Sequence, residues 1–354
     1  MGWIFKIPVL TFMFLMSTLF IKAEQPEIID DIDGTKSSDF DITYLIESKI
    51  IDDYQWHIID IGERKIYLYL PVILIGKTDQ GWRSSVFMSS KFDHGKNEYA
   101  GYRYNKGKIE SIDGHTFYDI SITKNVLSLF FVVLIMCLIF ISVAKTYKNR
   151  VGMAPKGFQS LIEPIIIFVR DDIVKNSIGE KKYRKFLPYL LTLFFFIWIN
   201  NLLGLVPIFP GKANVTGNIA VTLTLATLTL IVTNFNGTKA YWSHILWPPG
   251  IPIPIKIPLA VVEFIGIFTK PFALMIRLFA NITAGQILMM SIFGLIFLLA
   301  PAMSTGGALG LSIGTVLFAV FMNILKLVVA FLQAFIFTLL SSIFIGQAVE
   351  EGHH

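Results

Sequence analysis

Long apolar runs separated by polar loops dominate the last two thirds of the chain. A stretch of about twenty predominantly apolar residues is enough for a helix to cross a bilayer, so five such runs predict five spans. They lie at residues 126–144, 186–206, about 215–235, 257–300 and 308–348. The last two runs are longer than a perpendicular crossing requires, which predicts two helices that tilt steeply or bend.

The beginning of the chain has a different pattern. Residues 1–23 combine the positive charge of Lys6, an apolar core at 7–21 and a small residue, Ala23, at their end. This arrangement is typical of a secretory signal, and its cleavage is favoured over retention as a first anchor, because fifteen apolar residues are short for a span.

Residues 24–120 predict a small β-rich exported region. Its first part is acidic, and short strand-like runs follow at 65–75, 82–88 and 98–104. Turn-forming sequences interrupt them, Asp79-Gln80-Gly81 and Asn105-Lys106-Gly107. The predicted fold is therefore an all-α polytopic membrane protein, residues 121–354, preceded by this exported region. No function can be assigned to the exported region from its sequence.

The distribution of positive charge predicts the topology. Between Lys145 and Lys185 the chain carries ten Lys or Arg and four Asp or Glu. Because cytoplasmic loops of membrane proteins are enriched in Lys and Arg, we expect this loop in the cytoplasm, the mature N-terminus outside and the C-terminus inside. Residues 158–174 have apolar positions at helical spacing and predict a helix that lies on the membrane surface. Residues 236–258 form a Pro- and Trp-rich connection.

Composition supports this class and excludes others. Of 354 residues, 54% are hydrophobic and only 16% charged, and the mean hydropathy is +0.64. The net charge of +5 does not indicate nucleic acid, because the basic residues flank apolar runs. A single cysteine, Cys137, excludes an intrachain disulfide. The sequence contains no phosphate-binding loop or metal-ligand spacing, so we expect no cofactor, no metal site and no catalytic residues.

One positive charge lies deep in the fourth run. Arg277 has about twenty apolar-dominated residues on either side, so it cannot readily snorkel to an interface. A guanidinium keeps its proton, and a charge at membrane depth normally faces a polar interior or an ion path. On a helix, Asn281 lies one turn beyond Arg277 and Glu263 falls near the same face. Small residues beside them would let another helix approach closely, namely Ala280, Ala284 and Gly285.

Other polar residues occur within the spans. Lys326 and Gln333 are seven residues apart in the last run and share a helix face. A lysine in mid-span is a functional candidate, although it reaches an interface more easily than a central arginine. Asn200, Asn201 and Asn218 belong to the second and third spans, where interhelical hydrogen bonding is the commoner role of asparagine.

Several motifs resemble the a subunit in the membrane sector of bacterial F-type ATP synthases. The likeness covers the chain from about Phe117 to its C-terminus, in order. R-L-F-x-N-x-x-A-G followed some fifty residues later by Q-A-F-I-F is a very specific pair. The matching segments are INNLLGLVPI at 199–208, EFIGIFTKP at 263–271, MIRLFANITAGQ at 275–286, LQAFIFTLL at 332–340 and VEEGHH at 349–354.

The resemblance implies a non-catalytic stator subunit in the bacterial inner membrane. Such a subunit supplies two aqueous half-channels to a rotating c-subunit ring, and it assembles with peripheral-stalk b subunits and the remaining subunits. Arg277 would be the essential arginine that faces the ring. Asn281 would line the path by which ions enter, Glu263 the path by which they leave, and Gln333 would face the arginine. By the same likeness, Asn201 and Asn218 are possible channel-lining residues.

Two positions depart from the better-known bacterial pattern. Gln286 stands where that pattern has a glutamate, and Lys326 where it has a histidine. At ~1.5 Å per residue they lie ~13 Å and ~10 Å from the level of the arginine, so they could meet at similar depth. Glutamine does not titrate, which leaves two interpretations of Lys326. It either passes protons or is a fixed charge that tunes the channel field.

Two other functions are compatible with charges inside spans. A secondary transporter could use Arg277 and Lys326 to bind an anionic substrate, but the internal repeats common in such transporters are not evident. A membrane scaffold could pair Arg277 with Glu263, but the two are ~21 Å apart along one helix. The a-subunit interpretation, with protons or sodium as the coupling ion, is therefore preferred.

Overall fold

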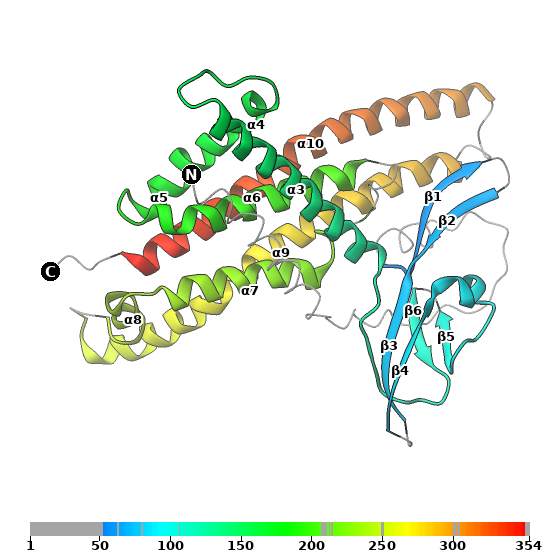
Figure 1. Ribbon diagram of the computed structural model, residues 1–354, viewed down its shortest axis with the longest axis horizontal. Coiled ribbons are helices and arrows are strands. Elements are labelled where there is room, and N and C mark those ends of the chain that lie inside the picture. The colour runs from blue at the N-terminus through cyan, green and yellow to red at the C-terminus, as the bar shows by residue number, and fades with distance from the viewer. Residues whose placement is uncertain are drawn as a thin grey trace.

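The computed structural model describes residues 52–350, except 62–63, 79–80, 106, 207–210, 212, 214, 249–250, 300–302 and 304. The expected signal at 1–23 and the acidic stretch at 24–41 lie outside these residues. Helices form most of the described chain, and the strands lie at the end of the molecule opposite to α8 and the C-terminus (Figure 1).

Among the described residues, seven strands confirm that the region before the first span contains β-structure. β1 (Gln55–Ile61) and β2 (Arg64–Tyr69) form an antiparallel hairpin. β4 (Gly81–Met88), β3 (Pro71–Thr78) and β7 (Phe117–Asp119) form a three-stranded antiparallel sheet in that order. β5 (Tyr102–Asn105) and β6 (Lys108–Ser111) form a second hairpin, and a short 3-10 helix, η1 (Ser89–Gly95), follows β4.

Two of the expected strands need correction. The run at 65–75 is not one strand, because it divides at Leu70 into β2 and β3; Pro71, which lacks an N–H, begins the second strand. Of the run at 98–104 only the part from Tyr102 belongs to a strand, because Gly101 turns the chain with a positive φ of 86°. Buried aromatic and branched residues fill the core between these elements: Tyr54, Val72, Leu74, Phe87, Phe92, Tyr102 and Ile109.

The junction between this region and the first span is held by a carboxylate. Asp52 accepts hydrogen bonds from the hydroxyl of Thr123 at 2.6 Å and from the backbone N–H of Asn125 at 3.1 Å. Thr123 is also the N-cap of α3 (Lys124–Asn149). Trp56 of β1 belongs to the same buried cluster as Leu129 of α3. The strands are therefore fixed against the start of the first span.

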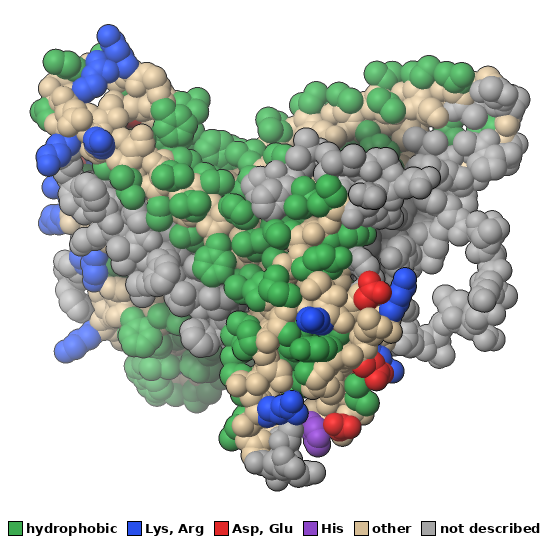
Figure 2. Space-filling model, turned by 45° about the vertical axis from the view of Figure 1, so that its right-hand side comes forward, with side chains coloured by type: hydrophobic (Ala, Val, Ile, Leu, Met, Phe, Trp, Pro, Cys, Tyr) green, Lys and Arg blue, Asp and Glu red, His purple; other side chains and the backbone are tan. Residues whose placement is uncertain are grey.

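The expected spans correspond to helices. Four helices of the described chain are long and apolar enough to cross a membrane, and α7 with α8, bent by 105°, makes up to a fifth. The spans are α3, α6 (Tyr183–Leu205), α9 (Ile253–Leu299) and α10 (Thr305–Val349), with α7 (Ile219–Phe235) and α8 (Lys239–Leu246) as the bent pair. Hydrophobic side chains cover much of the helical surface in Figure 2.

The connection at 236–258 is more helical than its prolines suggest. It contains α8, and α9 already begins at Ile253 instead of residue 257. Pro254 is tolerated because the first N–H groups of a helix have no intrahelical acceptor. α9 and α10 have 47 and 45 residues, or ~70 Å each, more than twice the ~30 Å of a hydrocarbon core, so both must tilt or bend.

The helix expected at 158–174 is present, and its place on the membrane surface stays a prediction. The helical segment extends to residue 178 in three pieces. They are α4 (Phe158–Phe168), a π-helical turn, η2 (Val169–Lys175), and α5 (Asn176–Ile178). α5 lies directly against α10, and Gly346 makes this possible, because a Cβ there would lie 2.1 Å from the carbonyl oxygen of Ser177. Lys182 Nζ donates a hydrogen bond of 2.7 Å to the carbonyl oxygen of Val349, and this bond fixes the last turn of α10.

Candidate functional site

Arg277 lies near the middle of α9, on a face that the rest of the described chain leaves uncovered. Its side chain is exposed, whereas Leu274 and Leu278, on the adjacent side of the helix, are buried. Among the described residues its guanidinium has no ion-pair or hydrogen-bond partner. The nearest exposed residues one turn or two away include three alanines and an amide, Ala273, Ala280, Asn281 and Ala284, and Lys270 and Ile276 are also exposed nearby. Another helix could therefore approach the arginine closely.

The contact between Lys326 and Gly285 aligns the two long helices. A Cβ at Gly285 of α9 would lie 3.5 Å from Cε of Lys326 in α10. The two helices are antiparallel and have the same rise per residue. The residue eight positions before Gly285 therefore lies at the same level as the residue eight positions after Lys326. Arg277 is therefore level with Gln333 and Ala334.

Gln333 and Arg277 share this level but not their environment. Gln333 is buried on α10, with 5% of its surface exposed, while Arg277 is exposed on α9. No hydrogen bond joins them within the described part of the chain. The two residues lie at one depth without a direct contact in this chain alone, and their facing stays a prediction.

Gln286 and Lys326 come together at a second level, ~12 Å along α9 from Arg277. The alkyl chain of Lys326 crosses Gly285, the immediate neighbour of Gln286. Oε1 of Gln286 is buried and has no hydrogen-bond partner among the described atoms. A buried amide oxygen without a donor is costly, so a water molecule or an ammonium group would be favourable there. Glu263 lies well away from this level, where its charge acts on the Tyr241 hydroxyl of α8.

Comparison with known proteins identifies the family to which this architecture belongs. Residues 126–346 match the family model described as ATP synthase A chain. The chain belongs to this family. Its members are the proton-conducting a subunits of F-type ATP synthases. The match begins in α3 and includes every expected site residue.

Curated relatives agree with the family match. The chain is 42% identical over 267 residues to ATP synthase subunit a of Chloroherpeton thalassium, which covers 69% of this chain and 76% of that protein. The corresponding protein of Chlorobium phaeobacteroides strain DSM 266 is 43% identical, with 67% and 68% covered. That of Myxococcus xanthus is 38% identical, with 67% and 75% covered. Residues 45–127 match a second model, described as a domain of unknown function (DUF8433).

The asparagines of the second and third spans make structural hydrogen bonds. Asn201 of α6 accepts from the hydroxyl of Thr216 at 2.7 Å and donates to the carbonyl oxygen of Ala330 in α10 at 3.5 Å. Asn218 caps α7 by accepting from the N–H of Ala220 at 2.9 Å. Asn200 donates to the carbonyl oxygen of Phe196, one turn earlier. The interhelical role expected of asparagines in spans is confirmed for Asn201.

Two residues of the site were not found from the sequence. Gly285 provides the surface over which Lys326 passes, and Thr216 supplies the donor for Asn201. Gly285 stood in the recognised A-G-Q sequence, but only as one of several small residues. Thr216 precedes the first turn of α7 and carries no pattern that points to a partner on α6.

Proposed function

We propose that this a subunit conducts protons through two half-channels that meet at Arg277, and so turns ion flow into rotation of a c-subunit ring. The observation that carries the proposal is the uncovered arginine at the centre of α9, bordered by alanines. Each c subunit would bring one membrane carboxylic acid to this face. The fixed positive charge would lower the proton affinity of that carboxylic acid and favour proton release.

Arg277 also separates the two half-channels. A guanidinium repels protons and does not titrate at any physiological pH, so it prevents a direct leak between them. The ionised carboxylate stays near Arg277 until it reaches the other half-channel and is reprotonated. Gln333, level with the arginine but buried behind it, would orient the guanidinium during ring passage.

Residues on the two sides of Arg277 would line the half-channels. Asn281, Gln286 and Lys326 lie on the side toward the end of α9 and would line the path by which protons enter. Glu263 lies on the other side, toward α8, and would line the path by which they leave. In this arrangement the β-rich region is periplasmic and the C-terminus cytoplasmic, and b subunits of the peripheral stalk bind from the cytoplasmic side.

The test is ATP-driven proton pumping by membrane vesicles that contain the complete synthase with Arg277→Ala. We expect pumping to be lost while the complex still assembles and hydrolyses ATP. Lys270→Ala is the matched control, because it removes a positive charge from the same helix two turns earlier, where Nζ lies over the Phe344 ring. Unimpaired pumping by Arg277→Ala would refute the proposal, as would an equal loss in the control.

Lys326 is proposed to pass protons between the channel water and the ring. Its Cε lies against Gly285, the chain neighbour of Gln286, whose buried side-chain oxygen has no described hydrogen-bond partner. Lys326→Gln should reduce pumping and change its pH profile. Lys326→Arg stays charged but does not release its proton, so it should also reduce pumping and should not give the pH profile of the unchanged protein. If Lys326→Gln leaves both rate and profile unchanged, the lysine is only a fixed charge that tunes the field.

A further inference from the structure

The β4-β3-β7 sheet has one face that no described part of the chain covers, and this face is apolar. Along β4 the burial alternates, with Ser85 and Phe87 turned inward. The apolar side chains on the opposite face of β4 are exposed: Trp82 to 65%, Val86 to 68% and Met88 to 46%. The outward face of this sheet thus presents large apolar groups to its surroundings, which marks an interaction surface.

Register extends this face across all three strands. Val86 pairs with Ile73, and Trp82 pairs with Lys77. Tyr118 of β7 pairs with Ile75 and is 67% exposed, and its ring stacks on Trp82 with a centroid distance of 6.2 Å. The N–H groups of Ile120 and Ile122 bond to Ile73 and Pro71, so both residues continue the same face.

The charge on the face is one-sided. Lys77 is exposed on it, and no carboxylate occurs among the residues that the register places there. The β5-β6 hairpin is different: its surface carries the Arg103–Glu110 ion pair at 2.8 Å. An apolar face with a tryptophan, a tyrosine and a single lysine has the composition of a surface that meets anionic headgroups.

The position of the face relative to the first span indicates its partner. Ile122 is separated from α3 by Thr123 alone, and Ile120 lies within ~13 Å of the helix start in extended chain. α3 has 26 residues, or ~39 Å, so its ends reach the headgroup layers of a ~30 Å hydrocarbon core. The Asp52 hydrogen bonds and the buried Trp56 fix the strands against this end of α3. The apolar face therefore begins at the depth where the bilayer ends.

We propose that the outward face of the β4-β3-β7 sheet docks on the lipid surface on the side of the membrane where α3 begins. Trp82 and Tyr118 enter the headgroup layer, Val86, Met88 and Ile120 contact the acyl boundary, and Lys77 meets lipid phosphates. The region that precedes the first span would thereby hold α3 at a defined tilt. This inference requires that α3 spans the membrane and is independent of proton conduction by the site at Arg277.

Depth measurements on the full chain test this docking. In a Cys137→Ala background, a single nitroxide is attached at Val86→Cys or Tyr118→Cys, and the control is Lys108→Cys on the exposed surface of β6. The protein is reconstituted into vesicles of phosphatidylglycerol with phosphatidylcholine. Accessibility to oxygen, which concentrates in lipid, is compared with accessibility to a water-soluble nickel chelate.

We expect the labels at positions 86 and 118 to favour oxygen and the label at 108 to favour nickel. Equal nickel access at all three positions would overturn the proposal, because the face would then be in water. Exclusion of both reagents at 86 and 118 would also overturn it, because a second copy or another subunit would then cover the face. Unchanged protease resistance of each labelled chain, relative to Cys137→Ala, shows that the fold is intact.

Lys77→Glu tests the electrostatic part separately. One basic residue near an anionic membrane changes the binding constant by about fivefold, so the reversal to glutamate should lower the ratio of docked to undocked protein by at least that factor on phosphatidylglycerol vesicles. On vesicles of phosphatidylcholine alone the substitution should have little effect. The same reduction on both compositions would show that Lys77 does not meet lipid phosphates.

Discussion

α6 and α9 are both apolar helices, but the chain uses them in opposite ways. In the most apolar stretch of α6, 83% of the residues are buried, against 17% in α9. α6 is enclosed by α3, α10 and the helical segment at 158–178, while α9 packs against α7, α8 and α10 and leaves its other side open. Arg277 lies on that open side. The enclosed helix supports the fold, and the open helix carries the residues expected to act on a partner.

The largest change in the free energy of unfolding should come from a substitution in the aromatic core around α6. Phe195 is fully buried and meets the Phe140 ring of α3 edge to face, with centroids 5.0 Å apart. Phe195→Ala should lower the free energy of unfolding by about 2–3 kcal/mol. This is mainly the cost of the cavity, because the alternative environment is itself apolar. The measurement is denaturant unfolding of the solubilised chain.

Phe272→Ala in α9 provides the matched comparison. Phe272 is 55% exposed, so its truncation leaves no cavity inside the chain and should change the free energy of unfolding by less than about 0.5 kcal/mol. Equal losses of unfolding free energy for Phe195→Ala and Phe272→Ala would contradict the conclusion that α6 is enclosed and α9 is open. Such a result would mean that α9 is covered by this chain itself.

A hydrogen bond between α6 and the segment that precedes α7 should have an intermediate effect on the free energy of unfolding. Thr216 donates to the buried Asn201 at 2.7 Å, so Thr216→Val should destabilise the chain by about 1 kcal/mol. Thr269 of α9 is exposed and bonds only to the carbonyl oxygen of Gly266 in its own helix. Thr269→Val should therefore have little effect in the same unfolding assay, and a loss equal to that of Thr216→Val would contradict this interpretation of Asn201.

The sequence predicted which segments cross the membrane, but not which of them lie inside. An unbroken apolar run such as that of Phe194, Phe195 and Phe196 has the same pattern whether lipid or protein surrounds it. The length of the apolar runs explains why two helices had to tilt or bend, and the family resemblance indicated that Gln333 faces Arg277. Helix rotation is decided by packing between distant segments, so the contact of Lys326 with Gly285 and the burial of Gln333 required the structure.

Local chemistry also had limits in the connecting segments. Pro254 and Pro258 suggested a loop, yet α9 includes both, because packing of α8 against α9 outweighs the propensity of individual residues. The strand at 82–88 was predicted from the sequence. Its consequence, an apolar face with Trp82 stacked on Tyr118, depended on the pairing of β3 with β7, which are separated by about forty residues.

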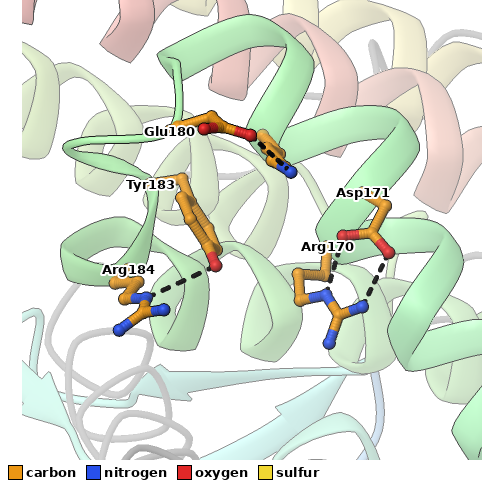
Figure 3. Close-up of polar contacts among 6 residues, drawn as sticks. Arg170, Asp171, Glu180, Tyr183 and Arg184 are labelled. Carbon is orange, nitrogen blue, oxygen red and sulfur yellow. Dashed lines mark hydrogen bonds and ion pairs between the residues drawn. The ribbon is translucent and has the colours of Figure 1, made fainter.

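The smallest change in the free energy of unfolding should come from an exposed ion pair in the helical segment at 158–178. Arg170 donates two hydrogen bonds to Asp171, at 2.8 and 2.6 Å (Figure 3). These bonds hold the pKa of the Asp171 carboxyl below its usual value near 3.8. The pair therefore contributes stability above about pH 4, and this contribution disappears as the pH falls through the lowered pKa.

Because both side chains of this pair are more than one third exposed, solvent screening limits the contribution to about 0.5 kcal/mol or less. Asp171→Asn should lower the free energy of unfolding by that amount at pH 7 and by nothing once Asp171 is protonated. Asp172→Asn is the matched control, because it removes the same charge one residue later without a described ion pair. Equal losses for the two variants at pH 7 would show that net charge, rather than the bond to Arg170, accounts for the effect. A loss above 1 kcal/mol for Asp171→Asn alone would mean that water does not reach this ion pair. The helical segment at 158–178 would then be enclosed, as α6 is.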